Sequence, residues 1–232
     1  MKHLRLLTIA LLGACSAVSL AQNVVTNNLN PKNTSAITGF VTTGSGMDGM
    51  TVTVTYGDGS VDTAVWGTTG TNAGAASFAG LWSLSLTGDS FNQPWTFSTS
   101  DNLQKRVSSI FLDGGPGKTV FDIKSDDLYS PNSGLGWPFQ ILSGITDPSA
   151  VTATYSSLLG IGGNPPIGDL FVTLNIDLGS QALAGGQSFT FRADTDNALT
   201  AIEVGDPVPE PFTMALVGGA LVAALKRRRS RK

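Results

Sequence analysis

Three oxygen-bearing side chains late in the chain are the first candidates for chemistry. Asp194, Asp196 and Asn197 lie together in the stretch DTDN, and Asp126 and Asp127 form a weaker acidic pair. Carboxylate and amide oxygens at this spacing are ligands that Ca²⁺ accepts. The same residue types are also typical of a solvated turn, in which Asx side chains bond to nearby backbone. Both interpretations of DTDN stay open, and the sequence predicts no other metal or cofactor.

A glycine-rich stretch, GGPGKT at residues 114–119, ends like a nucleotide-binding P-loop. The template GxxxxGK[ST] would place its first glycine at Leu112, and Pro116 removes a backbone N–H from any phosphate cradle. The following TVFDIK predicts a strand, whereas a P-loop must open a helix. We therefore interpret the stretch as a turn.

Aromatic side chains could stack on sugar rings, because they combine a large apolar face with a polar edge. Trp82 alternates in phase with Leu84 and Leu86, which predicts a place in the core. Trp137 stands beside Pro138 in a glycine-rich stretch. It is therefore the candidate for sugar stacking.

Two composition facts exclude whole classes of site. The only histidine is His3 and the only cysteine is Cys15, so a chain that loses its N-terminal segment has neither. That excludes Ser-His-Asp and Cys-His catalysis, Cys/His zinc sites and disulfides. Glu203 is the only glutamate between residues 22 and 206, which leaves few carboxylate pairs for glycoside hydrolysis. We expect a protein that is not an enzyme.

Charge is distributed unevenly along the chain. Residues 22–206 contain 16 acidic residues against six basic ones, a balance of −10, although the whole chain carries −3. Nucleic acid is not an expected partner, because phosphate binding needs a basic face.

Short alternating segments must position these candidates. Residues 51–56 and 61–66 flank the turn GDGS and predict a hairpin. Further strands are predicted at 81–86, 95–98, 107–112 and 119–123, and a second hairpin from 169–178 and 187–193. Residues 67–80 and 130–136 are expected to be loops. The pattern predicts an all-β fold, a single antiparallel β-sandwich or jelly-roll-like domain.

The N-terminal segment has the organisation of a signal peptide. A basic start precedes an apolar run from residue 6 to 14, and Ser19-Leu20-Ala21 fits the small-x-small rule for cleavage before Gln22. The alternative is a lipoprotein signal, because LGAC at residues 12–15 is similar to a lipobox. Either route exports the protein and makes signal peptidase a partner.

The C-terminal segment has three parts. Pro209-Glu210-Pro211 continues neither a helix nor a strand. The uncharged run FTMALVGGALVAAL, residues 212–225, would span about 21 Å as a helix, less than the roughly 30 Å of a hydrocarbon core. A basic cluster follows and keeps the end of the chain cytoplasmic; its members are Lys226, Arg227, Arg228, Arg229, Arg231 and Lys232.

This ending resembles the PEP-CTERM sorting signal in motif, order and terminal position, over about a tenth of the chain. The resemblance implies recognition by exosortase, a membrane-embedded cysteine protease/transpeptidase of Gram-negative bacteria that produce exopolysaccharide. It further implies that Pro209, Glu210 and Pro211 form the recognition motif, and that the helix is a transient membrane anchor. The body would then reach the cell surface or matrix, with exopolysaccharide as a candidate partner. An ordinary tail anchor is the alternative.

The sequence thus predicts a non-enzymatic exported protein with a structural or matrix role. A carbohydrate-binding β-sandwich module is the alternative, followed by an extracellular hydrolase. The expected segments are a signal peptide (1–21), a flexible leader (22–36), a β-sandwich domain (37–204), a linker with the Pro-Glu-Pro motif (205–211), a transmembrane helix (212–225) and a basic cytoplasmic tail (226–232).

N-terminal sequencing of the exported protein tests the signal peptide. We expect the mature chain to begin at Gln22, because the small residues Ser19 and Ala21 both stand just before the cleavage position, as the small-x-small rule requires. A first residue at a lipid-modified Cys15 would contradict this prediction and make the protein a lipoprotein.

Overall fold

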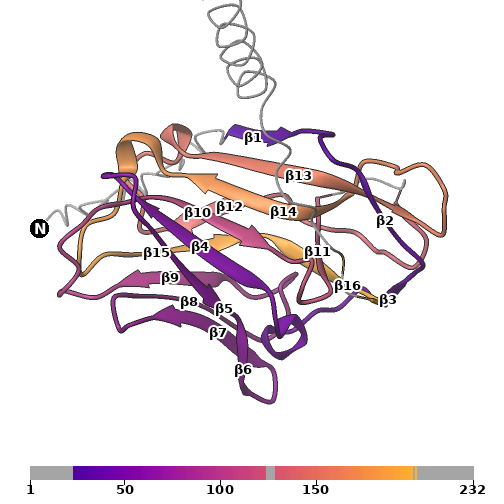
Figure 1. Cartoon of the computed structure of the whole chain (residues 1–232), viewed down its shortest axis with the longest axis horizontal. Helices are drawn as coiled ribbons and strands as arrows, with labels where there is room; N and C mark the ends of the chain where they lie inside the picture. The colour runs from indigo at the N-terminus through magenta and orange to yellow at the C-terminus, as the bar shows by residue number, and fades with distance from the viewer. Residues whose placement is uncertain (1–22, 124–128, 201, 203–232) are drawn as a thin grey trace, which may run out of the picture.

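Two β-sheets form the body of the protein. The computed structural model describes residues 23–123, 129–200 and 202, and within these ranges the chain forms strands and three 3₁₀ helices but no α-helix. Figure 1 shows the sheets as two layers, with β13 and β14 in one and β7, β8 and β9 in the other. The all-β fold expected from the sequence is confirmed.

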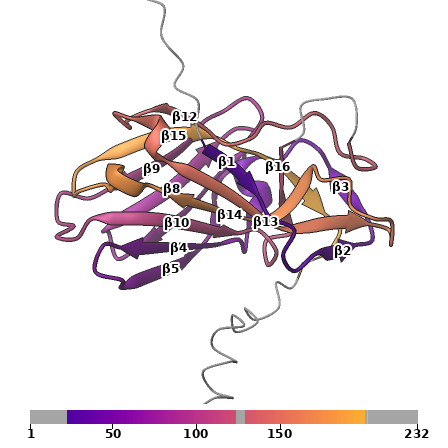
Figure 2. The same ribbon diagram turned by 90° about the horizontal axis from the view of Figure 1, so that it is seen from above.

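The larger sheet contains ten strands in the order β3-β16-β11-β14-β10-β4-β5, and β13 pairs with β14 off this path. Its strands are β1 (Asn23–Thr26), β2 (Lys32–Thr34), β3 (Ile37–Gly39), β4 (Thr51–Tyr56), β5 (Val61–Val65), β10 (Val107–Asp113), β11 (Thr119–Asp122), β13 (Thr152–Ile161), β14 (Leu170–Asp177) and β16 (Asp194–Ala198). Its neighbours are antiparallel except β1 and β2, which both pair with β13 in parallel (Figure 2).

The smaller sheet contains six strands in the order β12-β15-β9-β8-β7-β6. They are β6 (Gly67–Gly70), β7 (Ala73–Phe78), β8 (Trp82–Thr87), β9 (Trp95–Thr99), β12 (Gln140–Ser143) and β15 (Ser188–Arg192). The 3₁₀ helices are η1 (Gly44–Met47), η2 (Pro148–Ala150) and η3 (Gly179–Gln181). The consecutive strands β6 to β9 form a meander, whereas a jelly roll is built from two Greek keys.

Alternation along the strands creates the core between the sheets. In β4 and β8 every second residue is buried, as the side-chain period of two requires. The main cluster joins aliphatic side chains of β4, β10 and β14 to aromatic side chains of β8, β9 and β15. A second, smaller cluster contains Val120 and Leu170 together with Ile37 of β3 and Ile202.

The stretch GGPGKT is a tight turn between β10 and β11, as predicted. Lys118 donates its N–H to the Gly115 oxygen at 3.1 Å, and Thr119 donates to the Gly114 oxygen at 2.9 Å. A Cβ at Gly115 would lie 2.0 Å from the carbonyl oxygen of Ile202, and one at Gly117 would lie 2.5 Å from the backbone nitrogen of Met50. The glycines therefore serve close backbone packing.

The first predicted hairpin is confirmed as β4 and β5, whereas other expectations need correction. Residues 67–80 are not a loop, because they form β6 and β7. β14 and β15 do not form a hairpin, because they lie in different sheets. The stretch 22–36, expected as a flexible leader, contains β1 and β2. Residues 130–136 contain no strand, as expected.

The expected signal peptide, most of the linker, the transmembrane helix and the basic tail lie outside the described residues. Inside the described ranges, no helix has the length and apolar character that a membrane span needs.

Three buried tryptophans provide a matched stability test. The indole N–H of Trp66 donates to the Gly44 oxygen at 2.7 Å and that of Trp95 to the Ala193 oxygen at 2.8 Å. Trp82 Nε1 makes no hydrogen bond of good geometry with a described residue; its neighbour is the hydroxyl of Tyr56, which itself donates to Asp62 Oδ2 at 2.6 Å. Trp66→Phe and Trp95→Phe should therefore lower the free energy of unfolding by about 1 kcal/mol or more beyond Trp82→Phe.

Urea unfolding of the three variants measures this difference. Equal losses in all three would show that the indole hydrogen bonds contribute no stability beyond the packing of the rings.

Candidate functional site

Three buried carboxyl groups lie side by side on two neighbouring strands of the larger sheet. β11 pairs with β16 in a register that places Asp122 opposite Asp194 and Val120 opposite Asp196. The exposed fractions of Asp122, Asp194 and Asp196 are 0%, 2% and 1%. Buried carboxyl groups are costly unless they are hydrogen-bonded or neutral, so their surroundings matter. We call these three residues the carboxyl cluster.

Ser133, from the loop before β12, bridges two members of the carboxyl cluster. Its hydroxyl oxygen lies 3.0 Å from Asp122 Oδ2 and 2.6 Å from Asp196 Oδ2. A serine hydroxyl has one proton and can donate to only one of these oxygens. The second contact becomes a hydrogen bond when that carboxyl group is protonated and donates to Ser133 Oγ. The bridge therefore favours the state in which one of the two carboxyl groups is protonated and the other is ionised.

Ser90, between β8 and β9, holds the third member. Its hydroxyl donates to Asp194 Oδ1 at 2.8 Å and accepts the backbone N–H of Thr195 at 3.0 Å. The backbone N–H of Asp194 in turn donates to the Trp137 oxygen at 3.2 Å. The loop that contains Ser90 and the loop that contains Ser133 and Trp137 are thus both attached to β16.

Burial changes the protonation of these groups. Desolvation raises the pKa of Asp194 to about 7 and that of Asp196 to about 8, and the charge of Asp122 raises both. The hydrogen bonds from Ser90 and Ser133 lower the two pKa values, but by less than burial raises them. A pKa of about 8 favours the protonated form of Asp196 at neutral pH, and in that form its carboxyl group can donate within the cluster.

Asn197 is not brought into the cluster. Its Oδ1 accepts from Thr42 Oγ1 at 2.7 Å, and its Nδ2 donates to the Gly46 oxygen at 2.8 Å. In the described part of the chain, no three or more His, Cys, Asp or Glu side chains form a group arranged to hold a metal ion. Asp194 and Asp196 belong to a strand, so the solvated turn that was the alternative for DTDN is not formed.

Trp137 is 37% exposed and packs against two neighbours. The Arg192 guanidinium carbon lies 4.9 Å from the centre of its ring, and the Phe91 ring centre lies 5.7 Å away. A sugar that stacked on the face covered by Arg192 would have to displace this cation–π contact. Trp137 therefore anchors its loop as well as offering a partly exposed ring.

The other candidate residues lie outside the described ranges. These are the cleavage site Ala21 and Gln22, the acidic pair Asp126 and Asp127, the sorting motif Pro209, Glu210 and Pro211, and the basic residues Lys226, Arg227, Arg228, Arg229, Arg231 and Lys232.

Sequence reasoning missed Asp122, Ser90 and Ser133. The sequence signal for Asp122 was a charged residue directly after Val120 and Phe121 in a predicted strand. In the structure, all four residues of this strand, TVFD, are buried. A second missed pair is Ser130 and Asp169, whose side chains bond at 2.8 Å in a buried position beside this region.

No protein-family model, no curated protein and no solved structure matches this chain.

The carboxyl cluster makes stability depend on pH. Between the unfolded pKa near 4 and the folded values near 7 and 8, the folded chain binds more protons than the unfolded chain. This contribution to the free energy of unfolding is therefore complete below about pH 4 and is lost as the pH rises to about 8. The free energy of unfolding falls by at most about 1.4 kcal/mol per pH unit for each extra proton that the folded chain binds.

Thermal unfolding at pH 5 and pH 9 tests this prediction in Asp196→Asn, whose amide stays neutral and can donate to Ser133. The variant should lose less stability than the wild type between these pH values. The control is Asp177→Asn at an exposed position, which should behave like the wild type. An equal loss in Asp196→Asn and wild type would contradict a buried titrating Asp196.

Proposed function

We propose that this protein is an exported, non-enzymatic substrate of exosortase, delivered to the cell surface or exopolysaccharide matrix, where its all-β body has a structural role. The single observation that carries the proposal is the ending of the chain. Pro209-Glu210-Pro211, a short apolar run and a basic cluster follow one another in the order of a PEP-CTERM signal. The finer assignments, a cleaved signal peptide and a transient transmembrane helix, belong to the same proposal.

Processing at the motif would leave the described fold intact. The side chain of Ile202 is buried, and its backbone N–H donates to the Gly115 oxygen at 2.9 Å. It packs with Val120 and Ile37 in the second core cluster. Cleavage near Pro209 would therefore remove none of the described strands.

Cleavage at the expected N-terminal site would likewise spare the described strands. β1 spans Asn23–Thr26, on the C-terminal side of that site. The Asn23 side chain donates to the Ser149 oxygen at 3.1 Å, and the Asn27 N–H donates to the Tyr155 oxygen at 2.9 Å. Cleavage after Ala21 would leave this strand whole.

A structural role for the body is supported by the chemistry of its polar residues. The carboxyl cluster is buried, and its hydrogen bonds join β11, β16 and two loops. Groups used in this way stabilise a fold; a catalytic carboxyl group must also reach its substrate.

The length of the apolar segment generates a test of sorting. Because residues 212–225 are short for a permanent span, the exported form in an exosortase-positive host should lack residues 212–232. Mass spectrometry should find its C-terminus near Pro209 to Pro211. Replacing Pro209-Glu210-Pro211 with three alanines should leave full-length protein in the inner membrane.

Pro207→Ala is the matched control, because it removes a neighbouring proline outside the motif and should be processed normally. Surface protein that retained Arg227, Arg228 and Arg229 would refute sorting by exosortase. A tail-anchored domain would remain.

A further inference from the structure

A row of four serines crosses the outer face of the smaller sheet. Register places Ser77 opposite Ser83, Ser83 opposite Ser98, and Ser98 opposite Ser188, on the neighbouring strands β7, β8, β9 and β15. Neighbouring strands lie about 4.8 Å apart, so the row repeats a hydroxyl group at that interval. We call these residues the serine row.

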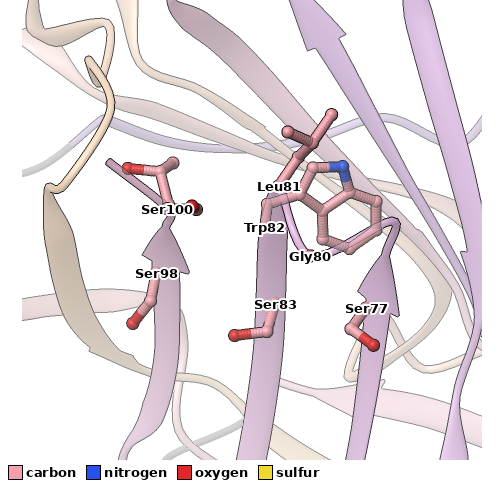
Figure 3. A pocket seen from close by; sticks show the side chains of 8 residues that line it. Ser77, Gly80, Leu81, Trp82, Ser83, Ser98 and Ser100 are labelled. Carbon is pink, nitrogen blue, oxygen red and sulfur yellow. The ribbon is translucent and has the colours of Figure 1, made fainter. Parts of the chain in front are cut away.

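A hollow of about 270 Å³ opens over this row. Ser77, Ser83 and Ser98 line it together with Leu81 and Ser100, which follow the turn before β8 and the end of β9. Figure 3 shows Ser77, Ser83 and Ser98 on three neighbouring strands, with Leu81 and Ser100 beyond the strand ends. The face is thus concave where it offers the most hydroxyl groups.

The hydroxyl groups of the serine row are not used by the fold. Among the described residues, no hydrogen bond joins the side chain of Ser77, Ser83, Ser98 or Ser188 to another group. Some hydroxyl groups elsewhere on the sheet surfaces are paired, as in Ser143 with Thr190 at 2.7 Å and Thr53 with Thr63 at 2.9 Å. Ser85 and Thr96, which lie opposite each other beside the row, have no side-chain hydrogen bond to another described residue either, so they extend the hydroxyl-bearing face. The serine row therefore keeps its donors and acceptors for water or a ligand.

Charge and polarity narrow the class of ligand. β7, β8 and β9 contain no charged residue, in a body whose balance is −10. Among the six strands of this sheet the one charged residue is Arg192, at the Trp137 end of β15, so a polyanion would meet a single cation and would be repelled by the body. The outward residues of β7, β8 and β9 are alanine, serine and threonine, without the large apolar side chains of a membrane-binding face. A neutral polymer that carries many hydroxyl groups matches both properties.

The same face continues toward Trp137. Along β15, Ser188, Thr190 and Arg192 alternate with buried Phe189 and Phe191, and Arg192 lies over the Trp137 ring. Two steps of the strand period separate Ser188 from Arg192, about 13 Å. A partly exposed aromatic ring therefore stands at the other end of the hydroxyl-lined face.

We propose that a neutral polysaccharide binds across this face, from the hollow over the serine row toward Trp137. The sugar hydroxyl groups exchange hydrogen bonds with the serines. This inference does not depend on the sorting signal, because the face belongs to the described body alone.

Sedimentation with insoluble polysaccharides tests the inference on the full chain purified in non-ionic detergent. The probes are cellulose, β-1,3-glucan, agarose and starch, with calcium alginate gel as the polyanion. Wild-type protein should sediment with at least one neutral probe. Ser83→Glu/Ser98→Glu, which fills the hollow with two charges, should weaken that retention about ten-fold or more.

Thr53→Glu/Thr55→Glu is the matched control, because it adds the same charge on β4 in the other sheet. It should retain wild-type binding, with circular dichroism confirming that both double variants are folded. If the Ser83/Ser98 variant is unfolded, Ser83→Ala/Ser98→Ala replaces it and should weaken retention several-fold.

Three results would overturn the inference: no retention on any neutral probe, preference for alginate, or equal retention by the serine variant and wild type. Loss of retention in Trp137→Ala with no loss in the serine variant would also overturn it, since binding would then depend on the aromatic ring alone. C-terminal processing is measured separately and should be unchanged in all these variants.

Discussion

One end of the molecule depends on the antiparallel pairing of β11 with β16. It brings Asp122 opposite Asp194, and the carboxyl cluster that results attaches the loops of Ser90 and Ser133. On its other edge, β16 pairs with β3. The turn between β10 and β11 then receives the backbone of Ile202. The buried carboxyl groups are tolerated because each is hydrogen-bonded and because burial raises the pKa of Asp196 to about 8, which favours its neutral form.

Side chains of the smaller sheet alternate between its inner and outer faces, so the positions of the residues on one face determine those on the other. Trp82, Phe97 and Phe189 form a row of aromatic rings inside, with ring centres 6.1 Å and 5.8 Å apart; the first pair is stacked and the second is tilted. Each of these residues is next in sequence to a member of the serine row on the same strand. Aromatic packing in the core therefore fixes the strand register that aligns the serines outside. The serine row is therefore positioned by strands, whereas Leu81, Ser100 and Trp137 lie in the connections at its borders.

Local patterns predicted the strands whose two faces differ most. β4 and β8 alternate between buried and half-exposed residues, so their sequences reveal them. β13 was missed because its second half is buried on both sides, which removes the alternation. β7 was missed because Ala73, Gly74, Ala75 and Ala76 are too small to give a hydrophobic signal. Sheet membership and the partners of Asp194 were not predictable, since both depend on pairing between strands distant in sequence.

The parallel strand β1 and β16, the last strand that the structure describes, have a consequence for the order of folding. β1 pairs with residues 152–155, and the Thr38 side chain in β3 donates to the backbone oxygen of Asn197, 159 positions later. Contacts of such long sequence separation slow folding, because loop closure must precede them. A ribosome that releases the chain from its N-terminus withholds the partner of β1 until about two-thirds of the 232 residues are made, and the partner of β3 until β16 follows. The β4–β5 hairpin and the meander from β6 to β9 have local partners and can pair earlier. The larger sheet is therefore completed only after β16 becomes available.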